Sequence, residues 1–173
     1  MCQLIRMTWV TNTMFNVRIR GIDAALRGLI RADDAIERFA RQGVNKAAEH
    51  LMDKVIAKFG KYQPTGGDPK GYGGWRKLKF TTLKKKASKG QPMVPLIATG
   101  ETVSSFSIKE GGRGRLAASV SSSSDHLVYH VYGVPGRNIP MRDPIRITAI
   151  EEKQACHDII EEYVMDALRR SGL

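Results

Sequence analysis

The chain has 173 residues, 42% of them hydrophobic, with a formal net charge of +11, which suits one globular domain that binds an anionic partner. Two cysteines, Cys2 and Cys156, exclude a disulfide framework, and no run approaches the ~18 apolar residues of a membrane-spanning helix. Because the start also lacks the pattern of a signal peptide, we expect no membrane contact and a reduced, intracellular protein, or one that leaves the cell inside a particle.

The first residues, 1–13, look like an added arm, because the first clear structural pattern comes after them. Phe15, Val17 and Ile19 alternate with polar residues. This period of two predicts a half-buried strand. We therefore expect an arm followed by a single domain over residues 14–173.

A long amphipathic helix is predicted over residues 23–59. Apolar residues recur there at spacings of three and four, and Arg and Lys fill the opposite face. At ~1.5 Å per residue such a helix is a rod of roughly 55 Å, unless it kinks or splits at Gly43.

A rod of that length overhangs its own core, since a domain of this size has a radius of gyration near ~15 Å. Exposed apolar surface of that extent usually marks an interface. We therefore expect a homo-oligomer in which this helix meets the C-terminal helix of the next subunit. The predicted interface residues are Phe39, Leu51, Phe59, Tyr163, Val164 and Leu168.

The positive charge is concentrated in the middle of the chain. Residues 60–115 hold 12 Lys or Arg and 3 Asp or Glu, a net of +9, whereas the two flanks together have a net of +2. Glycines and prolines interrupt residues 60–95, so this part is predicted to be a basic loop. An anionic partner accounts for such a charge, and so does a solvated lysine loop kept for solubility.

The basic loop opens with six glycines and two prolines in residues 60–74. Further along, Thr81 or Thr82 would cap a short helix that runs to Ala87. We expect the lysines of this loop to be exposed and mobile, and to face either DNA or an acidic patch of another protein. The predicted contact residues are Trp75, Lys84, Lys85, Lys86, Lys89, Arg113 and Arg115.

A β-hairpin with a basic tip is predicted after the basic loop. Phe106 and Ile108 start one strand, and Leu116, Ala118 and Val120 alternate in the returning strand. A pair of glycines turns the chain between the two strands. The hairpin would supply the rest of a small antiparallel sheet.

Two helices are predicted in the last third of the chain. Asp125 caps a short helix that stops at Gly133, and a capping box of Thr148 and Glu151 starts the last one. Together the elements predict an α+β fold. A small antiparallel β-sheet packs against a long N-terminal helix and a C-terminal helix.

Patterns typical of catalysis or metal binding are weak in this chain. His126 and His130 stand four residues apart on a predicted helix, but no third ligand accompanies them. Cys156 and His157 are adjacent, so on a helix they point roughly 100° apart and cannot form a nucleophile–base pair. The glycine-rich stretch GGDPKGYGG matches no nucleotide-binding motif. We therefore expect no enzyme activity, no cofactor and no metal site.

Four motifs follow one another in a particular order. They are a glycine-rich loop that ends at Trp75, the segment PLIATG at 95–100, the segment YHVYG at 129–133, and the segment IPMR at 139–142 before a final helix. In their order and spacing the chain resembles the tail-completion and head–tail joining proteins of tailed bacteriophages, the virion-morphogenesis type. The resemblance covers residues 14–168.

This resemblance implies structural work in a virus particle. Proteins of this type complete the tail at its head-proximal end and join it to the head-side connector, usually as a ring of subunits. The implied partners are a tail terminator or tail tube protein and the connector proteins of the neck, with DNA passing through the lumen. The implied location is the head–tail junction of the virion, and the host cytoplasm during assembly.

A rival interpretation is a non-specific nucleic-acid-binding protein that acts as a monomer or dimer. The lysine cluster would contact phosphates, and Tyr62, Tyr72 and Trp75 would stack on bases. Because no sequence-reading motif accompanies them, such binding would be independent of sequence. The size of the protein in solution and in the particle separates the two interpretations.

Overall fold

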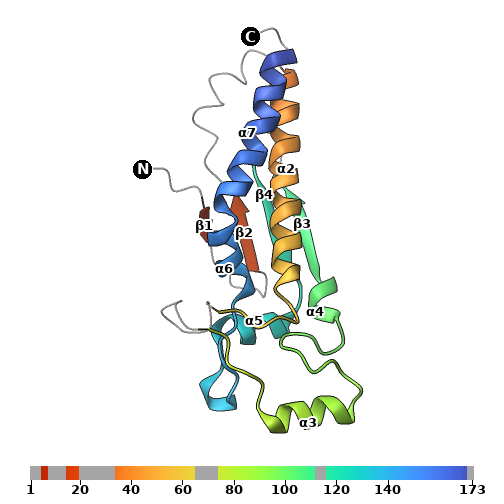
Figure 1. Cartoon of the computed structure of the whole chain (residues 1–173). Helices are drawn as coiled ribbons and strands as arrows, with labels where there is room; N and C mark the ends of the chain where they lie inside the picture. Colours follow the sequence, from red (N-terminus) through yellow and green to blue (C-terminus); the bar gives the residue numbers. More distant parts are fainter. Residues whose placement is uncertain (1–4, 8–14, 20–33, 65–73, 112–115, 171–173) are drawn as a thin grey trace.

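The protein has an α+β fold, as the sequence predicts. Two long helices, α2 (Asp34–Ala57) and α7 (Lys153–Arg170), lie side by side and pack against a small antiparallel sheet (Figure 1). None of the described helices is long and apolar enough to cross a membrane. The computed structural model describes residues 5–7, 15–19, 34–64, 74–111 and 116–170.

The sheet has four strands, all antiparallel, in the order β1-β2-β4-β3. Val120 of β4 is paired in register with Val17 on one side and with Ile108 on the other. Residues 5–7 belong to the expected arm, yet they form an edge strand beside β2; the rest of residues 1–13 lies outside the described part of the chain. The strands are β1 (Ile5–Met7), β2 (Phe15–Ile19), β3 (Phe106–Glu110) and β4 (Ala118–Ser122).

The predicted long helix is present as α2, although its expected first part, residues 23–33, lies outside the described residues. α2 runs without interruption through Gly43, so of the alternatives left open the helix is not split there. The role of Gly43 is close packing. A Cβ atom at Gly43 would lie 2.9 Å from the Cβ of Tyr163 and 3.3 Å from the Cα of Ile160. The missing side chain therefore lets the two long helices approach each other.

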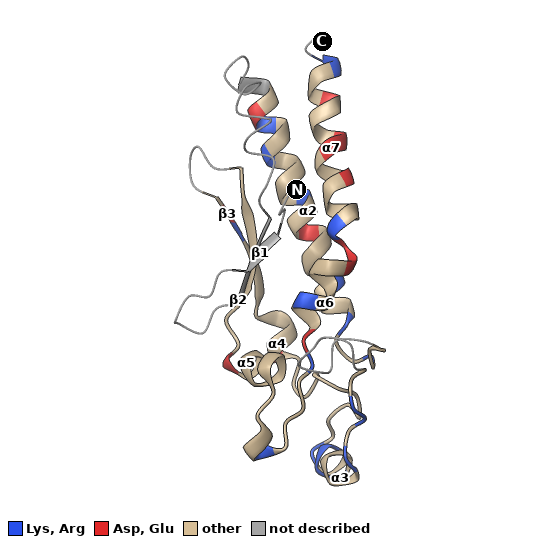
Figure 2. Cartoon of the chain, turned by 90° about the vertical axis from the view of Figure 1, so that its left-hand side faces the viewer, with Lys and Arg blue, Asp and Glu red and all other residues tan. Residues whose placement is uncertain are grey.

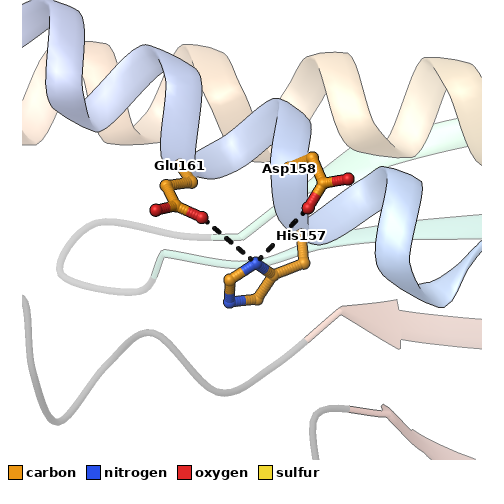
Figure 3. Close-up of side chains that lie close together, drawn as sticks. All are labelled: His157, Asp158 and Glu161. Carbon is orange, nitrogen blue, oxygen red and sulfur yellow. Dashed lines mark ion pairs between the residues drawn. The ribbon is translucent and has the colours of Figure 1, made fainter.

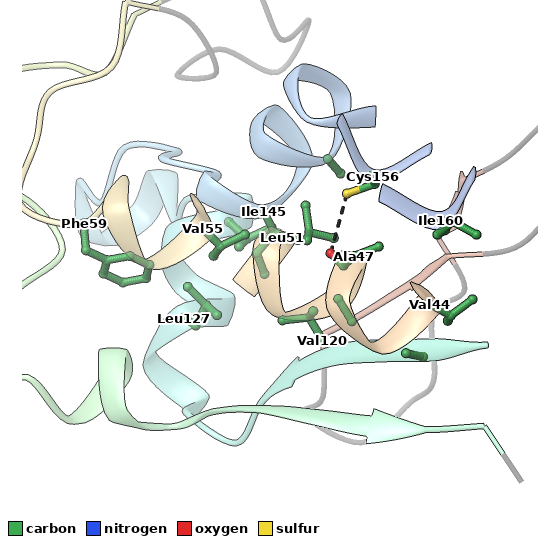
Figure 4. Packing of buried hydrophobic residues seen from close by; sticks show 14 residues of the cluster. Val44, Ala47, Leu51, Val55, Phe59, Val120, Leu127, Ile145, Cys156 and Ile160 are labelled. Atoms are coloured by element: carbon green, nitrogen blue, oxygen red, sulfur yellow. Dashed lines mark hydrogen bonds between the residues drawn. The ribbon is translucent and has the colours of Figure 1, made fainter. Parts of the chain in front are cut away.

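One hydrophobic core lies among α2, α7 and the sheet (Figure 4). Leu51 is 1% exposed and Phe59 is 6% exposed within it. The ring of Phe59 meets the ring of Phe106 edge-on, with 5.8 Å between their centres. Both residues were predicted to face a neighbouring subunit. That prediction is wrong, because residues of the same chain already cover them.

A second, smaller apolar cluster joins α2 to α7. Phe39 of α2 and Val164 and Leu168 of α7 are half-buried against it, and Tyr163 is packed at Gly43. The α7 stripe that was expected to receive a neighbour's helix therefore receives α2 of its own chain, which removes the expected overhang along this length. The buried members of the cluster are Ile36, Ala40, Leu116 and Ala167.

The two helices predicted in the last third are present, but the second begins earlier than expected. They are α5 (Asp125–Tyr132) and α6 (Pro144–Glu151), the latter followed by α7. The carboxylate of Asp143 caps α6 by accepting from two backbone N–H groups of its first turn, both at 2.9 Å. Thr148, predicted as the cap, lies inside α6 and its hydroxyl donates to the carbonyl of Pro144. An Asp followed by Pro is the stronger start signal.

Candidate functional site

Positive charge gathers at one end of the molecule, in residues 76–89, here called the basic segment. It holds seven Lys or Arg and no Asp or Glu. Its helix α3 (Phe80–Ser88) has no buried residue, and it lies at the end of the molecule away from the tips of α2 and α7 (Figures 1 and 2). A helix that buries nothing contributes little to the core, so its charge requires an explanation outside the fold.

The structure contradicts the prediction for the start of α3 and agrees with the prediction for its end. Lys79 occupies the N-cap position without a side-chain hydrogen bond, so the predicted threonine cap is absent. At the other end, the N–H of Gln91 donates to the carbonyl of Lys86 at 2.9 Å, and the N–H of Gly90 to that of Ala87 at 3.1 Å. Gly90 has a φ of +61°, and the two bonds form a Schellman motif. The predicted break at this glycine is confirmed.

Lys86 was predicted to be an exposed contact residue, and the structure corrects this. Its ammonium group donates to the carbonyl of Pro92 at 2.9 Å and to the carbonyl of Ile97. Burial lowers the pKa of Lys86. The side chain therefore holds the chain that follows α3 in place. The lysines of the predicted set that are exposed are Lys84, Lys85 and Lys89.

The basic segment is fixed to the rest of the molecule at Trp75, His130 and Arg142, here called the junction. Trp75 is 5% exposed. Arg142 is 4% exposed, and its guanidinium donates to the carbonyl of Arg76 at 2.7 Å. The N–H of Arg142 donates to the carbonyl of His130 at 2.6 Å. Trp75 was predicted to contact a partner or DNA, and its burial shows instead a structural side chain.

Close backbone packing brings the segments of the junction together. Gly133 has a φ of +69°, and a Cβ atom there would lie 2.9 Å from the backbone nitrogen of Met141. Only glycine avoids both the strained backbone and the contact. Three of the four motifs noted in the sequence, those at Trp75, 129–133 and 139–142, therefore meet at one place.

The junction contributes one positive charge. Burial, followed by the positive charges of Arg142, His126 and Lys86, lowers the pKa of His130 to about 4, so this imidazole is uncharged at neutral pH. Burial also lowers the pKa of Arg142. Within the described residues, Trp75 Nε1, His130 Nδ1 and Arg142 Nε have no hydrogen-bond partner. The charge of the junction is therefore that of Arg142.

A large apolar side chain on the basic segment was missed by the sequence reasoning. Phe80 is 80% exposed at the first position of α3, one turn before Lys84. Exposed aromatic side chains of this kind are used as anchors at interfaces. The sequence carries no clear signal for this exposure, because Leu83, three residues later, gives Phe80 an apolar neighbour on the same helix face.

Of the other residues predicted to contact a partner or nucleic acid, Tyr62 is the one that the structure describes. Arg113 and Arg115 lie outside the described residues, and so does Tyr72. Tyr62 is exposed, and its hydroxyl accepts from the N–H of Leu78 at 3.1 Å. The described part of the site therefore consists of the basic segment and the junction that supports it.

Negative charge gathers on α7, where residues 154–168 hold four Asp or Glu and no Lys or Arg. His157 Nδ1 lies 4.0 Å from the carboxylate of Asp158 and 3.6 Å from that of Glu161 (Figure 3). Among the described residues, these three form the one group whose ligand atoms come within 4.8 Å of one another. The group lies on the surface, where such ion pairs are ordinary.

Cys156 points the other way on α7. Its thiol donates to the carbonyl of Ala47 at 3.6 Å, and burial, followed by the charge of Glu152, raises its pKa to about 11. The thiol is therefore protonated at neutral pH and is not a nucleophile. The predicted divergence of Cys156 and His157 is confirmed.

Comparison of the chain with protein-family models, curated proteins and solved structures gives no match. Its function is therefore inferred from the geometry of the basic segment and the junction, and from the order of the four motifs.

Proposed function

We propose that this protein is a structural component of a tailed-phage particle. It completes the tail and joins it to the head-side connector at the neck, as a ring of subunits. The proposal rests on two features that occur together at one end of the molecule. Three of the four motifs of the resemblance meet at the junction, and the junction supports a basic segment whose helix buries no residue.

Each motif has a mechanical role around the basic segment. Trp75 begins the segment with a buried side chain, and the carbonyl of Ile97, in the motif at 95–100, accepts from Lys86. His130 and Arg142 connect the other two motifs. A docking surface has to keep its shape while nothing covers it, because ordering it on binding would cost affinity. Motifs that hold a surface element in place therefore suit a docking function.

The positive charge of the basic segment suits a protein in the neck of a phage particle. Exposed cations bind DNA phosphates without regard to sequence, and they also complement acidic patches of neighbouring proteins. The exposed lysines of α3 are available for either contact, since none of Lys84, Lys85 and Lys89 is buried.

Deletion of the gene from the phage that carries it tests the proposal. We expect filled heads and finished tails that stay unjoined in electron micrographs, and joined particles when the wild-type chain is supplied from a plasmid. Joined, infectious particles from the deletion alone would contradict the proposal.

A triple variant, Lys84→Ser with Lys85→Ser and Lys89→Ser, tests the role of the basic segment. Lys86 is kept because it is bonded within the chain. Surface substitutions usually change stability by less than about 0.5 kcal/mol each, so we expect an unchanged circular dichroism spectrum and a loss of titre in the complementation assay. The matched control removes three exposed cations of α2. A wild-type titre from the triple variant would exclude a role for these lysines. The control positions are Arg38, Lys46 and Lys54.

The density of cations on the basic segment also favours the rival function, non-specific binding of nucleic acid. One observation weakens it, because Trp75 is buried and so does not stack on bases. The exposed rings of Tyr62 and Phe80 remain open to stacking. Joined particles in the deletion, together with salt-dependent binding of the purified chain to random DNA, would favour this rival.

A further inference from the structure

We infer that the basic segment of one subunit binds an acidic face on α7 of a second copy of this chain. The acidic face is formed by Asp158, Glu161 and Glu162. The inference rests on the proposed function, since it names the contact that builds the ring. Both surfaces are exposed, they carry opposite charge, and each has one large exposed apolar side chain.

In an isolated subunit, the positive charges of the basic segment repel one another. Lys85 and Lys89 stand four residues apart, at the helix positions where like charges repel. Within the described residues, no ion pair involves Lys84, Lys85 or Lys89. A helix of nine residues with no buried side chain gains little from the core to offset this repulsion. An acidic surface placed against it removes the repulsion.

The acidic face has the matching arrangement. Asp158, Glu161 and Glu162 are spaced by three and four residues, so they lie on one side of α7. The side chains of Asp158 and Glu161 are each 63% exposed. Their ionic neighbour among the described residues is His157, at 3.6 Å or more. This leaves most of the negative charge of the face available to a partner.

Each surface also carries an exposed apolar side chain beside one of its charges. Phe80 comes four residues before Lys84, and Met165 comes four residues after Glu161, so each shares a helix face with that charge. Both are exposed, Met165 by 43%. Contacts between a thioether and an aromatic ring are favourable. The pair Phe80 and Met165 can therefore meet at the side of the contact where Lys84 faces Glu161.

α3 and α7 lie apart on the molecule (Figure 2). A contact between two different surfaces can repeat head-to-tail from copy to copy, so that it closes into a ring or continues as a filament. A reciprocal pairing, in which α3 of each copy meets α7 of the other, would instead give a closed dimer, and the sedimentation coefficient distinguishes the two. The ring of the proposed function requires the head-to-tail contact, which does not depend on an overhang of the long helix.

The test uses two charge-reversed variants of the full chain. The first carries Lys84→Glu, Lys85→Glu and Lys89→Glu. The second carries Asp158→Lys, Glu161→Lys and Glu162→Lys. Sedimentation velocity is measured at about 50 mM and about 500 mM salt, because exposed charges are screened within a few ångströms at the higher value. Circular dichroism checks that both variants are folded.

We expect the wild-type chain to associate at low salt and to dissociate at high salt. Each reversed variant alone should remain a monomer. An equimolar mixture of the two should associate again, because every head-to-tail contact between unlike variants pairs opposite charges. A control with Arg38→Glu, Lys46→Glu and Lys54→Glu on α2 should associate like the wild type.

The inference fails if the reversed variants associate as the wild type does, or if the mixture does not recover. It also fails if the wild-type chain stays monomeric at low salt, or if the first variant loses only DNA binding. The gene-deletion experiment does not depend on any of these results, so the proposed function is tested separately. A further variant, Phe80→Ser, tests the apolar contact alone. It should weaken association roughly tenfold without any change of charge. Unchanged association would show that Phe80 takes no part in the contact.

Discussion

The α2–α7 pair and α3 use their side chains in opposite ways. In the pair, Gly43 lies against Tyr163, and Leu51 is almost completely covered. In α3 nothing is buried, and its largest side chain, Phe80, is mostly exposed. Covered apolar area is the main source of folding free energy. The stability of the molecule therefore comes mainly from the helix pair and the sheet, while the exposed residues of α3 are available to a partner.

A matched pair of leucine substitutions tests this comparison with the largest expected effect. Leu51→Ala removes a side chain from the core and should lower the free energy of unfolding by about 2–5 kcal/mol. Leu83→Ala, at a half-buried position of α3, should cost less than about 1 kcal/mol, because little apolar area is lost. Urea denaturation measures both values. Similar losses at the two positions would show that α3 shares the core.

The pH dependence of stability examines the junction between the two regions. His130 has its pKa lowered to about 4 in the folded chain, against ~6.5 when unfolded. As the pH falls below the unfolded value, the unfolded state takes up the proton first, so this group lowers stability progressively down to about pH 4. The expected loss is up to ~3 kcal/mol.

His130→Gln should reduce the slope of stability against pH between the two pKa values. Exposed His126 provides the control, and His126→Gln should leave most of the slope in place. Thermal unfolding at a series of pH values measures the slopes. An identical slope in wild type and His130→Gln would mean that the imidazole is accessible to protons in the folded chain.

Substitutions at helix caps should change stability less, and they again compare the scaffold with α3. Asp143 caps α6 with two hydrogen bonds, whereas Lys79 at the start of α3 makes no such bond. Asp143→Ala should cost about 1 kcal/mol, and Asp143→Asn much less because the amide oxygen also caps. Lys79→Ala should leave the unfolding midpoint where it is. A loss for Lys79→Ala equal to that of Asp143→Ala would contradict the contrast.

The smallest expected change in stability distinguishes Lys86 from its neighbour Lys85 in α3. Lys86→Met removes the bonds to two carbonyls and should cost about 1 kcal/mol. Exposed Lys85→Met should change stability by less than about 0.5 kcal/mol. Amide hydrogen exchange in residues 92–97 should speed up only in Lys86→Met. Equal exchange in both variants would show that the Lys86 bonds do not hold this part of the chain.

Much of the fold could be predicted because its signals are local. The alternation at Phe15, Val17 and Ile19 marks a strand, and the three- and four-residue spacing marks α2. The exceptions depend on distant partners. Gly43 has low helix propensity, and only its neighbour Tyr163 on α7 explains why the helix continues through it. A single sequence does not contain that pairing.

The candidate site was predicted in part for the same reason. The lysine cluster is visible in the sequence, and Lys84, Lys85 and Lys89 are exposed as expected. Whether a long side chain ends in solvent or on a carbonyl depends on the tertiary path of the chain, so Lys86 was misassigned. The burial of Trp75 was missed likewise, because a tryptophan beside glycines has the same local pattern whether it is covered or exposed.

A density map of the neck of an intact particle tests the central claim most directly, namely that the basic segment is a docking surface and the helix pair is a scaffold. The account predicts a closed ring of this chain between tail and connector, with α3 of each subunit in contact with another molecule and the α2–α7 pair unchanged. A neck without this chain, or a ring in which every α3 faces solvent alone, would contradict it.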